Sequence, residues 1–187
     1  MEDDVQGAVT VELVDADATR AFGRALAARL RAGDLVMLTG DLGAGKTTLT
    51  QGIGAGLGVR GQVASPTFVI ARVHPSLSDG PALVHVDAYR LGTLDEVDAL
   101  DLDASLEESV TVVEWGQGLV ESIAGARLEI TLERPRGASE SGGSDFLENA
   151  EVGVRSVTVT AHGERWAGLD VVALASGGAA AGPGSVG

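Results

Sequence analysis

The chain has 187 residues, 44% of them apolar, which predicts one α/β domain with a substantial core and leaves too little length for two full domains. Its formal net charge of −14 argues against autonomous nucleic-acid binding, because binding through phosphates requires clustered Lys and Arg. The absence of cysteine excludes disulfides and thiolate metal sites, and the acidic N-terminus and the lack of a long apolar run predict a soluble, cytoplasmic protein without a membrane segment.

The first predicted elements are a strand and an amphipathic helix. Residues 8–14 (AVTVELV) alternate in part between apolar and polar side chains, as a half-buried strand does. Asp17 or Thr19 would then cap a helix that runs to about Arg31 with its apolar residues on one face.

A glycine-rich loop joins the next strand to the next helix. The apolar run of residues 35–40 (LVMLTG) predicts a buried strand, and residues 46–57 (KTTLTQGIGAGL) predict a helix whose glycines weaken its intrinsic stability. The loop between them matches G-x-x-x-x-G-K-[ST], the phosphate-binding P-loop, in the strand-loop-helix setting that its mechanism requires.

Each residue type in this loop has a chemical role. Glycines let successive backbone N–H groups surround the phosphates, and the helix N-terminus adds the positive end of its dipole. Lys46, the only lysine in the chain, would reach the β- and γ-phosphates, and the Thr47 hydroxyl would bind Mg²⁺. We therefore expect ATP and Mg²⁺ to be held by the whole loop, which comprises Gly40, Asp41, Leu42, Gly43, Ala44, Gly45, Lys46, Thr47 and Thr48.

Two acidic residues follow apolar runs downstream of the loop. Asp87 follows residues 82–86 (ALVHV), and Glu114 follows residues 110–113 (VTVV). Each is expected at the carboxyl end of a buried strand, which is the edge where open α/β sheets bind ligands. An acid at that edge holds magnesium or orients the attacking water. His85 shares a strand face with Asp87, and we interpret it as a packed structural histidine.

The segment SPTF lies where the chain re-enters a predicted strand at residues 68–73, in the position of a switch segment. Thr67 would meet the γ-phosphate or the metal, and Pro66 would stiffen its approach. A turn followed by a buried phenylalanine is the structural alternative for this segment.

The remaining chain predicts helices, a strand pair and two segments outside the core. Residues 93–108 indicate one or two short acidic helices, and residues 128–135 and 154–162 alternate as an antiparallel pair. Residues 136–150 are rich in Gly, Ser and acids, which favours a mobile insertion. Residues 176–187 contain little that can pack, so we expect a disordered tail.

Four motifs, GDLGAGKTTLTQGIGAGLGV, SPTF, HVDAYRL and VVEW, occur in an order and spacing that resembles the bacterial TsaE (YjeE-like) ATPases. The resemblance covers about Asp15 to Glu133, with a weaker likeness around Arg155. The elements and the resemblance together predict a single domain over residues 1–175. Its expected class is α/β, a three-layer P-loop NTPase fold with a mostly parallel central sheet and antiparallel C-terminal strands.

The resemblance also implies a function. Proteins of this family act in synthesis of the threonylcarbamoyladenosine modification of tRNA. The resemblance implies an ATPase that assembles with the TsaD and TsaB proteins, contacts tRNA only indirectly through that complex, and hydrolyses ATP to drive or reset the assembly between turnovers.

Residue roles follow from the matching motifs. Thr47 and Glu114 resemble the magnesium ligands, and Asp87 the acid that positions water or acts as general base. Together with Lys46 and the switch residue Thr67, Asp87 forms the expected catalytic set. The resemblance implies roles for three further residues. Thr19 and Arg155 would contact the nucleotide, and Trp115 would pack beside Glu114 or form part of an interface.

Three other functional classes also use a phosphate-binding loop. A P-loop small-molecule kinase would need an arginine-bearing lid, and its nearest candidates, Arg134 and Arg136, border the acidic insertion. A GTPase would need an N-K-x-D motif, which cannot be built because Asn149 is the only asparagine. A regulatory module that binds ATP without turnover is not separated by sequence from a slow ATPase.

Overall fold

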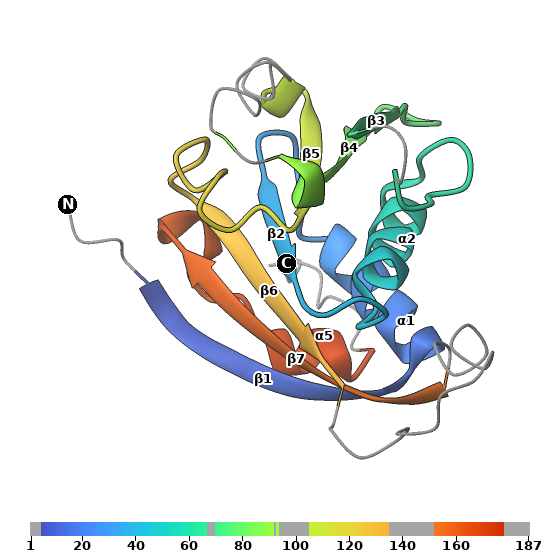
Figure 1. Cartoon of the computed structure of the whole chain (residues 1–187), viewed down its shortest axis with the longest axis vertical. Coiled ribbons are helices and arrows are strands. Elements are labelled where there is room, and N and C mark those ends of the chain that lie inside the picture. Colours follow the sequence, from blue (N-terminus) through green and yellow to red (C-terminus); the bar gives the residue numbers. More distant parts are fainter. Residues whose placement is uncertain (1–4, 67–69, 92, 94–104, 135–151, 178–187) are drawn as a thin grey trace, which may run out of the picture.

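The computed structural model describes residues 5–66, 70–91, 93, 105–134 and 152–177 (Figure 1). Among these residues, no helix is long and apolar enough to cross a membrane. The elements in chain order are β1 (Val5–Asp15), α1 (Ala16–Ala27), β2 (Leu35–Thr39), α2 (Lys46–Leu57), β3 (Ala71–His74), β4 (Ala82–Asp87), η1 (Ala88–Arg90), β5 (Ser109–Glu114), β6 (Arg127–Glu133), β7 (Val152–His162), η2 (Glu164–Trp166) and α5 (Val171–Ala175).

The strands form one seven-stranded sheet in the order β1-β7-β6-β2-β5-β4-β3. The four central strands β6, β2, β5 and β4 run parallel, so their carboxyl ends lie at one edge. β1 and β7 extend the sheet antiparallel on one side, and β3 does so on the other. The expected α/β fold with a parallel centre is therefore confirmed, with antiparallel strands at both ends of the sheet.

The parallel centre is apolar on both faces because both faces are covered. Val36 and Leu38 of β2 point into the cluster that contains the helices, whereas Leu35 and Met37 point into a second cluster on the opposite face. Segments that follow β4 and β5 supply the cover for this second cluster, including Val120. This arrangement explains why β2 is a continuous apolar run and not an alternating one.

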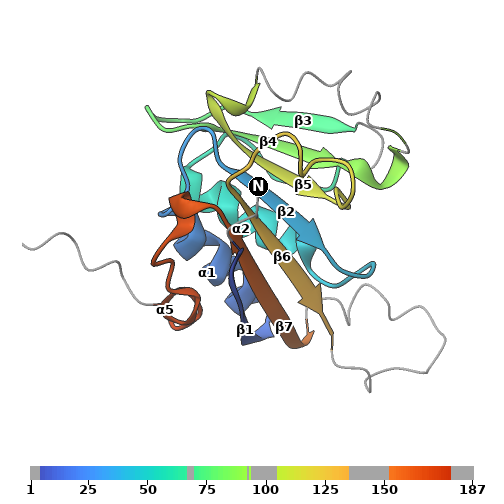
Figure 2. The ribbon, with the colours of Figure 1, turned by 90° about the vertical axis from the view of Figure 1, so that its left-hand side faces the viewer.

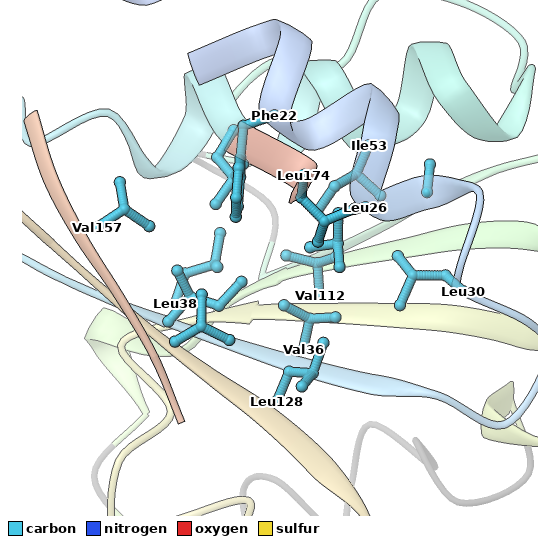
Figure 3. Close-up of a cluster of buried hydrophobic side chains, with 14 of the residues drawn as sticks. Phe22, Leu26, Leu30, Val36, Leu38, Ile53, Val112, Leu128, Val157 and Leu174 are labelled. Atoms are coloured by element: carbon cyan, nitrogen blue, oxygen red, sulfur yellow. The ribbon is translucent and has the colours of Figure 1, made fainter. Parts of the chain in front are cut away.

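Helices α1, α2 and α5 cover one face of the sheet (Figures 1 and 2). Figure 3 shows Phe22 and Leu26 of α1, Ile53 of α2 and Leu174 of α5 gathered above side chains of the central strands. All four of these side chains are at most 6% exposed, so the helices contribute most of their apolar surface to a single core. The other face of β6, β7 and β1 is polar, which explains their alternating sequences.

Glycines let α1 and α2 approach closely. A Cβ atom at Gly52 would collide with Arg20 O of α1, and one at Gly56 would lie 2.5 Å from Ala27 Cβ. On the opposing helix, a Cβ atom at Gly23 would lie 2.6 Å from Leu49 O. The glycines that lower the helix propensity of these segments are thus the residues that permit the close packing of α1 on α2. Because the contacts advance together along both helices, α1 and α2 run parallel and begin at the same end of the molecule.

The start of α1 differs from the predicted one. The N-cap is Asp15, whose Oδ1 accepts a hydrogen bond of 2.7 Å from Ala18 N, and neither Asp17 nor Thr19 caps the helix. Asp15 leaves β1 in an extended conformation, which carries its carboxylate to the free N–H groups of the first turn. The helix also ends at Ala27, before the predicted Arg31.

Several other predictions are tested only in part. The strand pair predicted near the C-terminus is present as β6 and β7, and β3 begins at Ala71. The short helix α5 was not predicted, and Ser176 closes it with a hydrogen bond from Oγ to Val172 O. The predicted insertion at residues 136–150, most of the acidic helical segment at residues 93–108, and the tail after Gly177 lie outside the described residues.

The α1–α2 contact gives a stability prediction. Gly52→Ala should lower the free energy of unfolding by about 1–3 kcal/mol, because overpacking against Arg20 O outweighs the gain in helix propensity of about 1 kcal/mol. Urea unfolding measures the change. The matched control is Gly125→Ala, at an exposed position with ordinary φ and no atom within 4 Å of the added Cβ, which should be near neutral. A Gly52→Ala variant as stable as the control would contradict the packing account.

A buried histidine on β3 predicts a pH dependence of stability. Burial lowers the pKa of His74 below its ordinary value of 6.5, although a backbone hydrogen bond with Arg60 opposes the shift. Below pH 6.5 the unfolded chain therefore takes up the proton before the folded chain does. The contribution of neutral His74 to the free energy of unfolding is therefore complete above pH 6.5. It is lost as the pH falls toward the lowered pKa, by at most about 1.4 kcal/mol per pH unit.

Urea unfolding of wild type and His74→Leu between pH 5 and pH 8 tests this dependence, at conditions chosen around the ordinary histidine pKa of about 6.5. The variant should show a shallower loss of stability on acidification. Parallel curves for the two proteins would show that His74 does not carry the effect.

Candidate nucleotide-binding site

The glycine loop leaves β2 and enters α2 through backbone conformations that favour glycine. Gly40, Gly43 and Gly45 have φ values of 149°, 79° and 111°. A Cβ atom at Gly40 would also collide with Leu132 O of β6, so this glycine is required for close approach as well as for its dihedral angle. The loop therefore adopts its turn only with glycine at these positions.

The loop rests on the ends of β6 and β7. Ala44 is buried, and a Cβ atom at Gly45 would lie 3.4 Å from Arg155 Nε. Arg155 is fully buried, and its Nη1 donates a 2.5 Å hydrogen bond to Gly153 O. Asp41 and Leu42 form the exposed tip, with Leu42 88% exposed. The base of the loop is thus fixed by packing, and its tip faces solvent.

Lys46 is held inside the loop. Its Nζ donates to Gly40 O at 2.6 Å and to Asp41 O at 3.1 Å, and it lies 4.2 Å from the centroid of the Trp115 ring. Burial lowers the pKa of Lys46, while the nearby Glu114, Asp87 and Asp41 carboxylates oppose the shift. The ammonium group is therefore surrounded by acidic and π-electron partners at the start of α2.

Glu114 is the buried acid of the site. It ends β5 and is 3% exposed. Its Oε1 accepts a 3.1 Å hydrogen bond from Thr47 Oγ1 and lies 2.8 Å from His85 Nε2. The side chains of the P-loop threonine and of the strand-end acid, 67 positions apart in sequence, are thus in direct contact.

Asp87 lies beside Glu114 on the neighbouring strand. The two residues are register partners at the carboxyl ends of β4 and β5, and Glu114 is also the register partner of Leu38 in β2. Asp87 Oδ1 accepts a 3.0 Å hydrogen bond from Tyr89 N. The acids predicted at strand ends therefore lie at the same edge of the sheet as the glycine loop.

Trp115 reaches Lys46 through an unusual backbone conformation. Its N–H donates to Leu38 O at 3.0 Å, and its φ is 61°, a left-handed value that is rare for a bulky residue. The exposed Tyr89 ring meets the indole edge-on at a centroid distance of 5.5 Å. The turn after β5 thus places an aromatic pair over the lysine. Sequence patterns do not reveal such a conformation, and the Lys46–Trp115 contact was not predicted.

The donor set suits magnesium. Among the described residues, no three His, Cys, Asp or Glu side chains gather to hold a metal by themselves. The Thr47 hydroxyl and the Glu114 carboxylate, with Asp87 beside them, form a hard-oxygen set of few protein ligands. Mg²⁺ typically keeps several waters and binds one or two carboxylates together with substrate phosphates, so these residues fit it.

Other predicted residues are placed differently. Thr19 is fully buried, and its hydroxyl donates to Asp15 O at 2.9 Å, so it supports the start of α1. Thr48 is half-buried in the first turn of α2. Thr67 lies outside the described residues, but the preceding segment is tied to α2 by a 3.1 Å bond from Gln51 Nε2 to Val63 O.

The contact between His85 and Glu114 was not predicted from the sequence. The sequence predicted a packed structural histidine, and His85 is fully buried, but its Nε2 also lies 2.8 Å from Glu114 Oε1. Its position two residues before Asp87, on the same face of β4, is the sequence signal that indicates proximity to the site.

Comparison with known proteins identifies the family. Residues 13–141 match the family described as Threonylcarbamoyl adenosine biosynthesis protein TsaE. The chain belongs to the TsaE family. It is 62% identical over 157 residues to the Streptomyces coelicolor tRNA threonylcarbamoyladenosine biosynthesis protein TsaE, covering 83% of this chain and 99% of that protein. It is 37% identical to the Bacillus subtilis TsaE protein, covering 82% of this chain and 85% of the relative.

A solved structure supports the same placement. The crystal structure of Bacillus subtilis YdiB is similar with a TM-score of 0.60 and 33% identity, covering 86% of this chain and 89% of YdiB. The TsaE resemblance predicted from four short motifs is thus confirmed.

Proposed function

We propose that this TsaE-family chain binds Mg-ATP at its glycine loop and hydrolyses it slowly in support of tRNA threonylcarbamoyladenosine biosynthesis. The observation that carries the proposal is the 3.1 Å contact between Thr47 of the loop and Glu114 of β5, with Asp87 in register beside Glu114. A loop that binds phosphate is combined there with the two acids that an ATPase requires.

The loop and its lysine bind the polyphosphate. Backbone N–H groups of Gly40 to Thr48 and the N-terminus of α2 favour anions, and Lys46 supplies the positive charge for the β- and γ-phosphates. Arg155 supports this role from beneath Gly45. Thr19 contributes indirectly, by bracing the start of the helix that packs on α2.

Thr47 and Glu114 are the proposed magnesium ligands. When bound, the ion neutralises charge on the phosphate oxygens. The Thr47 hydroxyl donates a hydrogen bond to Glu114, so both lone pairs of Thr47 Oγ1 are available to a cation. The local carboxylates outnumber the single ammonium of Lys46, so a divalent cation also lowers the repulsion that an incoming polyphosphate would meet.

Asp87 is the proposed water-positioning acid. One oxygen is fixed by the Tyr89 N–H, and Oδ2 accepts no hydrogen bond from the described residues. Asp87 is only partly buried, so that oxygen is accessible to water. Asp87 accepts a proton from the attacking water or orients it, and Thr67 is the proposed switch residue that senses the γ-phosphate.

The partners that complete the reaction are proposed to be TsaD and TsaB, with tRNA reached only through their complex. The tip of the glycine loop and Tyr89 are exposed. The edge of the sheet where the nucleotide is proposed to bind is therefore accessible to another protein. The net charge of −14 makes direct tRNA binding unfavourable for this chain.

Phosphate release from ATP tests this partnership. The purified chain should release phosphate slowly, and addition of TsaD and TsaB should increase the rate. Equal rates with and without the partners would contradict partner dependence. ATP binding without any phosphate release in either mixture would instead favour a regulatory module.

Two substitutions separate binding from turnover. Glu114→Ala should weaken magnesium-dependent binding of an ATP analogue by about tenfold, or about 1.4 kcal/mol, because a metal ligand is lost. Asp87→Ala should bind the analogue normally and lose turnover. Fluorescence titration and phosphate release measure the two effects.

The matched control for both variants is Glu12→Ala, an exposed acid on β1. It should retain binding and turnover. Undiminished hydrolysis in Asp87→Ala would remove the proposed role of that acid.

A further inference from the structure

His85 is a fully buried polar residue that the proposed chemistry does not use. Its side chain is 0% exposed, the Glu114 side chain is 5% exposed, and His85 Nε2 lies 2.8 Å from Glu114 Oε1. The two side chains come from adjacent parallel strands, with His85 of β4 paired in register with Val112 of β5. This contact therefore lies within the parallel centre of the sheet, near the carboxyl ends of β4 and β5.

The direction of the hydrogen bond follows from the chemistry of the partners. An ionised carboxylate only accepts hydrogen bonds, so His85 Nε2 carries the proton and donates it to Glu114. His85 Nδ1 is buried and has no hydrogen-bond partner among the described residues. Among the residues that the structure describes, the hydrogen bond with Glu114 is thus the one polar contact of the ring.

The two oxygens of Glu114 have different surroundings. Oε1 accepts from both Thr47 Oγ1 and His85 Nε2, which come from α2 and β4. Both hydrogen bonds that Glu114 accepts from the described residues are made by Oε1, and Oε2 accepts none from them. Two donors from separate elements therefore fix the orientation of the carboxylate and leave one oxygen to bind a metal or its water.

Packing alone does not account for a histidine at this position. The neighbouring residues Val84 and Val86 are buried and apolar, and an aliphatic side chain would fill the site without burying a polar atom that lacks a partner. Leaving such an atom buried costs about 1–3 kcal/mol. The contact with Glu114 is what the histidine provides and a leucine does not.

From this geometry we infer that His85 is a positioning residue that orients Glu114 Oε2 toward magnesium. The inference rests on the proposed Mg-ATP function and adds to it a residue from β4 that touches neither metal nor nucleotide. Ligand-orienting residues of this kind change metal affinity by about 10- to 100-fold when removed.

Nucleotide titration with and without magnesium tests the inference. Full-length protein binds the fluorescent analogue mant-AMP-PNP in magnesium or in EDTA. His85→Leu should reduce the gain in affinity that magnesium provides by about 10- to 100-fold and should leave the affinity in EDTA unchanged. His85→Gln extends an amide N–H toward Glu114 and should restore most of the gain. His85→Asn is too short to reach Glu114 and should not.

The matched control is His74→Leu. His74 is also buried, lies on the neighbouring strand β3, and has an Nε2 atom without a hydrogen-bond partner among the described residues. The hydrogen bonds and ion pairs of Glu114 among those residues are with Thr47 and His85, not with His74. Its magnesium-dependent gain should equal that of the wild type. Thermal unfolding of each variant shows whether the fold is retained.

The outcomes distinguish the inference from the function on which it rests. An undiminished magnesium-dependent gain in His85→Leu would overturn the positioning role. If that variant does not fold, equal gains in His85→Gln and His85→Asn would overturn it, and a gain retained only in His85→Gln would support it. A wild-type protein that gains no affinity from magnesium would overturn the proposed function itself.

Discussion

Glu114 is a carboxylate buried at the carboxyl end of β5, and the organisation of the site follows from its need for hydrogen-bond donors and nearby positive charge. A buried charge is tolerated only with hydrogen-bond donors or opposite charges around it. Thr47 and His85 donate to it, and Lys46 lies close enough for its pKa to respond to it. One acid therefore connects the glycine loop, the first turn of α2 and the β4 strand into a single polar cluster at the carboxyl ends of the parallel strands.

The close packing of α1 and α2 is the mechanical counterpart of this polar cluster. Gly23, Gly52 and Gly56 let the backbones of the two helices approach closely. Helix α2 begins at Lys46. Apolar residues of both helices then seal the same face of the sheet. Because interiors are close-packed, the position of α2 is set by α1, and the Thr47–Glu114 contact depends on that position.

The electrostatics of the site favour the binding of a cation. Glu114, Asp87 and Asp41 all act on the pKa of Lys46, so one ammonium group faces several carboxylates. A polyphosphate alone would meet that negative charge at short range. The magnesium ion of the proposed function would lower this repulsion, and the hard-oxygen donors at this edge fit such an ion.

The sequence by itself determined the P-loop, the α/β class, the strand-end positions of Asp87 and Glu114, and the TsaE family, because each depends on local spacing or on motif order. Which acid touches which donor was decided only by the tertiary structure. The register of β4 against β5 sets His85 beside Glu114, and the left-handed backbone at Trp115 sets the indole over Lys46. The N-cap at Asp15 likewise depends on how β1 ends. Such contacts join residues far apart in the chain, and hydrophobic periodicity carries no information about pairings between separate elements.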